Sequence, residues 1–114
     1  MSHLSILPTV LTDETLLAQA LQDLHFEVQW GGELRGFADD RQAVLLSIAA
    51  SADQRLGWSR QADGSLALVG DLQKLGRSSA LQSLIAQITR RYALHQALLA
   101  AQSELPTVNV ELVS

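Results

Sequence analysis

The sequence of 114 residues contains no cysteine. Disulfide bonds, thiolate nucleophiles, cysteine-ligated iron–sulfur clusters and zinc fingers are therefore excluded. Aromatic residues make up only 4% of the chain, so leucine, valine, isoleucine and alanine must fill the core. No apolar run approaches 18 residues, and no basic segment followed by an apolar one opens the chain. We therefore expect neither a membrane-spanning helix nor a secretory signal, and we expect a cytoplasm-like compartment.

Basic residues are also few, with 8 lysines and arginines against 12 acidic residues and a formal net charge of −4. Binding to nucleic acid or to an anionic membrane needs a concentrated basic surface, so the charge balance disfavours both partners. A hydrophobic fraction of 47% beside 18% charged residues is typical of a globular chain. The length suits a single domain over residues 1–114.

Hydrophobic periodicity predicts the elements of the first half. Residues 4–11 are expected to form a strand, with Pro8 at its edge or end. Thr12 is the expected N-cap of a helix with one apolar face, made of Leu16, Leu17, Ala20, Leu21 and Leu24. Residues 26–30 alternate as a half-buried strand, and Gly31-Gly32 predicts a tight hairpin into residues 33–37. A bulge or a longer loop there is the alternative, because a two-residue loop would pair apolar with charged side chains.

In the second half, the apolar run 43–49 predicts a central strand. A second hairpin is expected at Asp63-Gly64, between a strand around Trp58 and residues 65–70. Residues 71–76 are expected to form a loop, and a long helix is expected from Ser79 to Gln102. Its predicted buried stripe comprises Leu81, Leu84, Ile85, Ile88, Tyr92, His95 and Leu99, with Leu98 beside it.

These elements, with a closing strand at residues 108–112, give the order β-α-β-β-β-β-β-α-β. The prediction is an α+β fold, with two helices packed on one face of a mainly antiparallel sheet.

The polar residues show no spacing typical of catalysis or metal binding. His3, His25 and His95 lie far apart in sequence, and no pair has the i, i+4 spacing of a helical metal site. His95 is expected to form a hydrogen bond at the edge of the core. Trp30 and Trp58 fit either a binding surface or simple core filling. We therefore predict no catalytic residues, no metal site and no cofactor.

Arg90 and Arg91 are the only adjacent basic pair in the chain. A nucleic-acid site would need more basic residues and accessible aromatics around them. We expect the two guanidinium groups to lie on the solvent flank of the long helix and to pair with acidic side chains.

Several short segments resemble a known family in their order along the chain. They are Met1-Ser2-His3-Leu4-Ser5, the helix 16–24, Phe26-Glu27-Val28, Leu56-Gly57-Trp58, the hairpin 63–69 and Arg91-Tyr92-Ala93-Leu94-His95. Together they resemble the Ycf35-like family of cyanobacteria and plastid genomes, a family of unknown function (DUF1257). The resemblance implies no catalytic residues and marks His3, Tyr92 and His95 as family positions without an assigned role.

Two functional hypotheses follow. The first is a non-enzymatic accessory protein of a cyanobacterial or plastid-like compartment, cytoplasmic or stromal, that docks on a protein partner or forms a homodimer. Its contact would be an exposed strand edge or the flank of the long helix, around Arg90, Arg91, Tyr92 and His95. The second is a small-ligand or metal-binding regulatory domain, which requires His3, Tyr92 and His95 to converge on one pocket.

Overall fold

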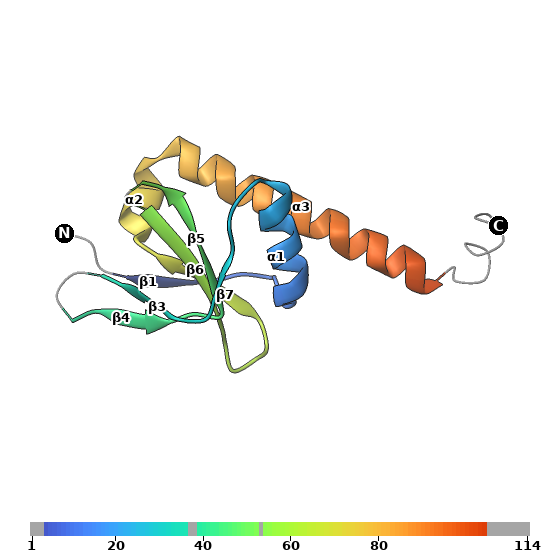
Figure 1. Cartoon of the computed structure of the whole chain (residues 1–114), viewed down its shortest axis with the longest axis horizontal. Helices are drawn as coiled ribbons and strands as arrows, with labels where there is room; N and C mark the ends of the chain where they lie inside the picture. The colour runs from blue at the N-terminus through green and yellow to red at the C-terminus, as the bar shows by residue number, and fades with distance from the viewer. Residues whose placement is uncertain (1–3, 37–38, 53, 105–114) are drawn as a thin grey trace.

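Five strands form one antiparallel sheet in the order β1-β7-β6-β5-β2 (Figure 1). The computed structural model describes residues 4–36, 39–52 and 54–104. The strands of this sheet are β1 (Ser5–Pro8), β2 (Gln29–Trp30), β5 (Leu46–Ser51), β6 (Gln54–Arg60) and β7 (Leu66–Gly70). Two further strands, β3 (Glu33–Arg35) and β4 (Arg41–Ala43), form a separate two-stranded sheet. The central strand β6 is joined to β7 by the hairpin that Asp63-Gly64 predicts.

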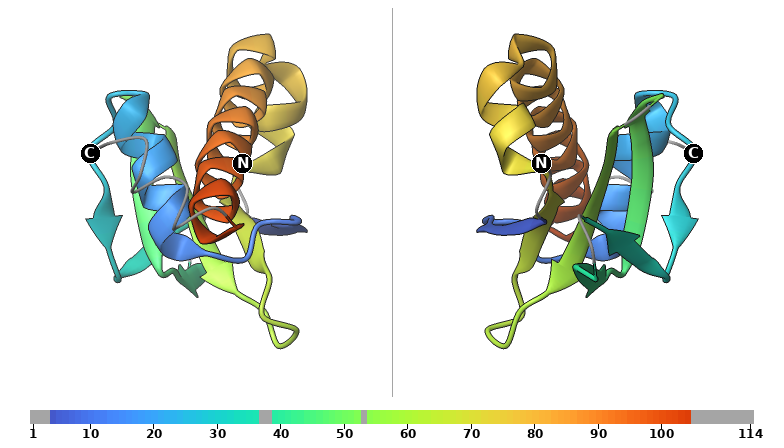
Figure 2. Two further views of the ribbon diagram at one scale, coloured as in Figure 1. Left: turned by 90° about the vertical axis from the view of Figure 1, so that its right-hand side faces the viewer. Right: turned by 90° about the vertical axis from the view of Figure 1, so that its left-hand side faces the viewer.

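Alternate side chains of the three inner strands make the main core. Those that point to one face are all buried: Leu46, Ile48, Leu56, Trp58, Leu66 and Leu68. Because successive residues of a strand point to opposite faces, this alternation gives the sheet one apolar face. The helices α1 (Glu14–Asp23) and α3 (Ser79–Glu104) lie beside each other and pack their own apolar residues into the same core (Figure 2). The predicted α+β fold is therefore confirmed. The predicted single central strand at residues 43–49 is wrong, because residues 41–43 form β4, residues 46–51 form β5, and β6 is the central strand.

The opposite face of the sheet carries a second, smaller core under β3 and β4. Leu34 and Val44 are buried there with Val69. A Cβ atom on Gly57 would lie 2.7 Å from Val44 Cγ1 and 3.0 Å from Leu34 Cδ1. Glycine at position 57 thus lets this two-stranded arm lie directly on the central strand.

The predicted hairpin at Gly31-Gly32 is wrong. Gln29 and Trp30 pair with β5, and residues 33–35 pair with β4, in one uninterrupted antiparallel register. Hydrogen bonds from Gly31 N to Leu45 O and from Val44 N to Gly32 O continue the ladder across the two glycines. Both glycines have positive φ, 74° and 83°, which other residues rarely adopt. They therefore bend one long hairpin, so that its outer part leaves the main sheet.

The helix α1 begins one residue later than the sequence suggested. Asp13, not Thr12, is its N-cap, and the Asp13 carboxylate accepts hydrogen bonds from the N–H groups of Thr15 and Leu16. Either residue type suits this position, so composition alone did not decide between them. The helix ends with His25 at φ 70°, with hydrogen bonds from His25 N to Gln22 O and from Phe26 N to Leu21 O. This pairing is a Schellman motif, whose left-handed position most often holds glycine.

The expected loop at residues 71–76 is also wrong, because a short helix, α2 (Leu72–Arg77), occupies it. The Asp71 carboxylate accepts hydrogen bonds from the N–H groups of Gln73 and Lys74, which caps the helix. An aspartate directly before a helix was the missed signal. Ser78 then starts α3, with its hydroxyl accepting a hydrogen bond from Leu81 N.

The predicted long helix is confirmed as α3, but the predicted extent of its buried stripe is wrong. Ile88 and Tyr92 are buried, and Leu84 and Ile85 are partly buried against the core. Leu98 and Leu99 are instead 51% and 52% exposed, because α3 continues past α1 and the sheet (Figure 1). The predicted strand 108–112 lies outside the described residues.

Candidate interaction surface along the long helix

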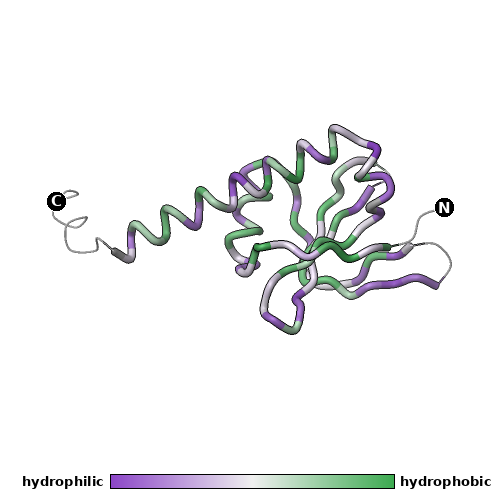
Figure 3. The backbone as a smooth tube through the Cα atoms, turned by 180° about the vertical axis from the view of Figure 1, so that it is seen from behind, coloured by the Kyte–Doolittle hydropathy of each residue, from purple (hydrophilic) through white to green (hydrophobic). Residues whose placement is uncertain are grey.

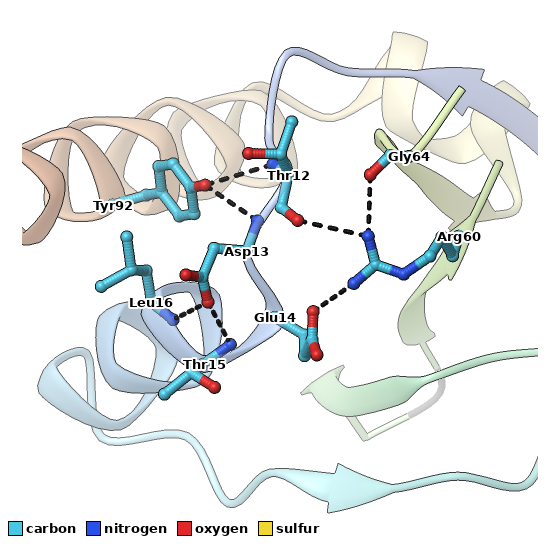
Figure 4. A network of polar contacts seen from close by, with 8 residues as sticks. All are labelled: Thr12, Asp13, Glu14, Thr15, Leu16, Arg60, Gly64 and Tyr92. Atoms are coloured by element: carbon cyan, nitrogen blue, oxygen red, sulfur yellow. Dashed lines mark hydrogen bonds and ion pairs between the residues drawn. The ribbon is translucent and has the colours of Figure 1, made fainter. Parts of the chain in front are cut away.

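Tyr92 holds the chain at the point where it enters α1. Its side chain is only 3% exposed, and its hydroxyl oxygen accepts hydrogen bonds from Thr12 N at 3.1 Å and Asp13 N at 3.0 Å (Figure 4). The first N–H groups of a helix and of its cap lack partners within the helix, so an outside acceptor is needed. The Tyr92 hydroxyl supplies that acceptor from α3.

Arg60 ties the same region to the β6–β7 turn. Its guanidinium donates to Thr12 O at 3.3 Å and to Gly64 O at 2.7 Å, and it forms an ion pair with Glu14 (Figure 4). These contacts join three segments of the chain. Arg60 could not be identified from the sequence, because its partners come together only in the fold.

Asp23 is the corresponding anchor at the other end of α1. His95 Nε2 lies 2.5 Å from Asp23 Oδ2, and Arg91 Nε lies 3.9 Å from the same oxygen. The predicted hydrogen bond of His95 at the edge of the core is therefore confirmed. Tyr92 and His95, three residues apart on α3, thus hold opposite ends of α1.

The residues of the second hypothesis are not seen to share a pocket. Tyr92 and His95 reach different ends of α1, and His3 lies outside the described residues. Within residues 4–36, 39–52 and 54–104, no three His, Cys, Asp or Glu side chains are grouped to hold a metal ion. His25 is exposed at the end of α1.

The two tryptophans differ in environment. Trp58 is buried in the main core, and Trp30 is 58% exposed on β2 at the edge of the sheet. Trp58 therefore fills the core, whereas Trp30 remains a surface side chain.

An open groove lies where α3 leaves α1. It has a volume of about 410 Å³ and is lined by Leu24, Gln87, Arg90, Arg91 and Leu94. Arg91 is held near Asp23, whereas Arg90 is exposed and forms no ion pair with any described residue. The prediction that both arginines pair with acids thus holds only for Arg91.

After Arg91, α3 is largely exposed and has few charged residue types. No lysine, arginine, aspartate or glutamate lies between Arg91 and Glu104. Leu94, Leu98 and Leu99 are 45%, 51% and 52% exposed on this part of the helix. Figure 3 shows hydrophobic residues recurring to the end of the described helix. No helix in the described part of the chain is both long and apolar enough to cross a membrane. This exposed segment, residues 93–103, is called the α3 extension below.

No curated protein and no protein of known structure matches the chain significantly. One family, described as "Protein of unknown function (DUF1257)", matches residues 20–111. That match runs from within α1 through every later strand and both later helices. The chain therefore belongs to the DUF1257 family.

Proposed function

We propose that this chain is a non-enzymatic accessory protein that docks on a protein partner through the α3 extension. The observation that carries the proposal is the exposure of three leucines on a helical segment that has no lysine, arginine, aspartate or glutamate and contributes nothing to the buried core. Exposed apolar surface of this kind is typical of contact sites. An amphipathic helix that presents apolar residues at helical spacing is also a recurring form of protein recognition.

The polar residues near this segment support an interaction role over catalysis. The Tyr92 hydroxyl accepts two backbone N–H groups, and His95 is engaged by Asp23. Both side chains thus hold α1 against α3.

The resemblance to Ycf35-like proteins supports a setting for this role. We place the protein in a cyanobacterial cytoplasm or, for plastid-encoded relatives, in the plastid stroma. The net charge of −4 supports a protein partner over a nucleic acid. The proposal includes neither a cofactor nor insertion into a membrane.

Co-purification from cyanobacterial cells tests the proposal. Full-length tagged protein is compared with Leu98→Glu, which places a charge on the α3 extension, and with Ala62→Glu, which places one on the distant β6–β7 turn, where Ala62 is exposed. We expect quantitative mass spectrometry to find the same partner with the wild type and with Ala62→Glu, and to lose it with Leu98→Glu. Recovery of the tagged protein alone, or equal recovery of the partner with all three proteins, would overturn the proposal.

A further inference from the structure

We infer that the α3 extension pairs with the α3 extension of a second copy of this chain, with the two helices antiparallel. The inference rests on the proposed function, because both assign the α3 extension as a contact surface. It goes further in naming the occupant and the geometry of the contact.

The first observation is a continuous seam along one side of α3. Positions 87, 91, 94, 98 and 101 are separated by alternating steps of four and three residues, the spacing with which one helix presents a stripe to another. The first three of these positions line the open groove beside Leu24. Leu98 and Ala101 continue the same side onto the exposed segment. The groove and the extension therefore form one surface, long enough to receive a second helix.

The second observation is that the two ends of the seam carry opposite charges. The last carbonyl groups of a helix have no partner within it and make that end partially negative. The last turn of α3 contains no basic residue, and the helix ends at Glu104. Arg90, on the rim of the groove, has no ion pair among the described residues. A second helix entering the groove by its C-terminal end would bring these opposite charges together.

These two observations fix the direction and the register. An antiparallel pair centred between Ala97 and Leu98 sets Leu94 opposite Ala101, and it brings position 104 of one copy beside Arg90 and Arg91 of the other. Both ends of the contact are then equivalent, as twofold symmetry requires. A parallel pair would instead place the two pairs of arginines side by side. Between Arg91 and Glu104 the helix has no lysine, arginine, aspartate or glutamate that would oppose self-association.

The size of the seam sets the strength of the contact. Stable interfaces use about 20–30 residues on each side, and this seam with its groove offers fewer. We therefore expect a dimer with a dissociation constant in roughly the micromolar range. The full-length protein should change from monomer to dimer across this range in sedimentation equilibrium.

Two leucines one position apart give a matched pair of variants. Leu98 lies on the seam, whereas Leu99 points about 100° away around the helix, and their exposures are nearly equal. We expect Leu98→Glu to weaken the dimer by about 100-fold, because it places a charge at the centre of the contact. Leu99→Glu should leave the dissociation constant within about threefold of the wild type. Far-ultraviolet circular dichroism checks that both variants remain folded.

Charge exchange tests the register. Arg90→Glu and Glu104→Lys should each weaken the dimer by about threefold to tenfold, and the double variant should recover most of that loss. Failure of the double variant to recover affinity would overturn the assigned register.

The absence of native cysteine allows a test of direction. A mixture of the Leu94→Cys and Ala101→Cys variants should form a mixed disulfide on mild oxidation. Ala101→Cys alone should crosslink slowly, because the two 101 positions are about 10 Å apart along an antiparallel pair. Rapid crosslinking of Ala101→Cys alone would overturn the antiparallel arrangement.

The outcomes separate this inference from the proposed function. A wild-type protein that stays monomeric up to about 0.5 mM, far above the expected range, overturns the dimer. The proposed function would still stand if Leu98→Glu loses the cellular partner. A dimer that depends on Leu98, together with unchanged partner recovery by Leu98→Glu, supports the inference and overturns the proposed function.

Discussion

The two halves of α3 both carry apolar residues at helical spacing, but their surroundings differ. In the first half, Ile88 and Tyr92 are buried against α1 and the sheet. In the second half, Leu98 and Leu99 recur at helical spacing but are about half exposed. Helical periodicity therefore shows that a helix has an apolar side, but not whether the same chain covers it. In this protein α1 packs against α3 only as far as its own last residue, Asp23, which contacts Arg91 and His95.

Truncating one side chain in each half gives the largest expected contrast. Ile88→Ala should lower the free energy of unfolding by about 2–4 kcal/mol, because it leaves a cavity in a packed core. Leu98→Ala should change it by less than about 0.5 kcal/mol. Urea unfolding followed by circular dichroism measures both, at a protein concentration low enough to keep the chain monomeric. Equal losses would show that the α3 extension is also packed against its own domain.

A smaller effect is expected from removing the hydroxyl of Tyr92. Tyr92→Phe keeps the ring in the core but leaves the N–H groups of Thr12 and Asp13 without their acceptor. We expect a loss of about 1–3 kcal/mol in the free energy of unfolding. The measured loss shows how much of the difference in stability between the two halves of α3 comes from the hydrogen bonds of Tyr92 instead of apolar burial.

Thr89→Val is the matched control for Tyr92→Phe. The Thr89 hydroxyl bonds to Ile85 O within its own helix, on an exposed side. We expect its removal to cost less than about 0.5 kcal/mol. Similar values for the two variants would mean that water replaces the Tyr92 hydroxyl, and the anchor would then be unimportant for stability.

The elements that were predicted correctly are determined by residues close to one another in the sequence. The α3 helix follows from its apolar repeat, and the β6–β7 hairpin from Asp63-Gly64 between alternating strands. Their ends are marked by residues whose backbone or capping preferences act at short range. The hydrogen bond of His95 was also predictable, since the residue lies where the helix meets the edge of the core.

The features that sequence missed depend on partners far along the chain. Two adjacent glycines such as Gly31-Gly32 are typical of a hairpin turn. Here the strands on both sides of them pair with residues 41–47, so the glycines bend a strand instead of reversing the chain. The exposure of Leu98 and Leu99 depends on the length of α1, which no property of α3 reveals. Arg60 bonds to the Thr12 carbonyl 48 positions away in the sequence, so no local spacing pointed to it.

The C-terminal end of α1 holds backbone strain that a single substitution can relieve. His25 has a φ of 70°, a conformation that costs residues other than glycine about 1–2 kcal/mol. His25→Gly should therefore raise the free energy of unfolding by up to about 1 kcal/mol, as judged by urea unfolding. The proposed dimer should keep its affinity, because the change affects only the anchored half of the α1–α3 contact.

His25→Ala is the control, since alanine removes the imidazole without relieving the backbone. We expect no gain in stability from it. If His25→Ala stabilises the protein as much as His25→Gly does, the imidazole itself is unfavourable and the backbone argument fails.

The smallest expected effect comes from Asp63, which touches neither half of α3. Hydrogen bonds from the Ser65 hydroxyl at 2.6 Å and from Ser65 N at 3.0 Å hold the pKa of Asp63 below its usual value. The folded protein therefore binds this proton less tightly than the unfolded chain does. The stabilising contribution is present above the unfolded pKa of about 3.9 and is lost as the pH falls through the lower folded pKa.

Urea midpoints of the wild type and Asp63→Asn at several pH values test this assignment. The wild type should hold a small advantage at pH 6 that shrinks as the pH drops below about 4. Ser65→Ala should reduce the same pH dependence by removing the hydroxyl donor. A wild-type advantage that stays constant with pH would mean that Asp63 stabilises the turn through its shape and hydrogen bonding, and not through its charge.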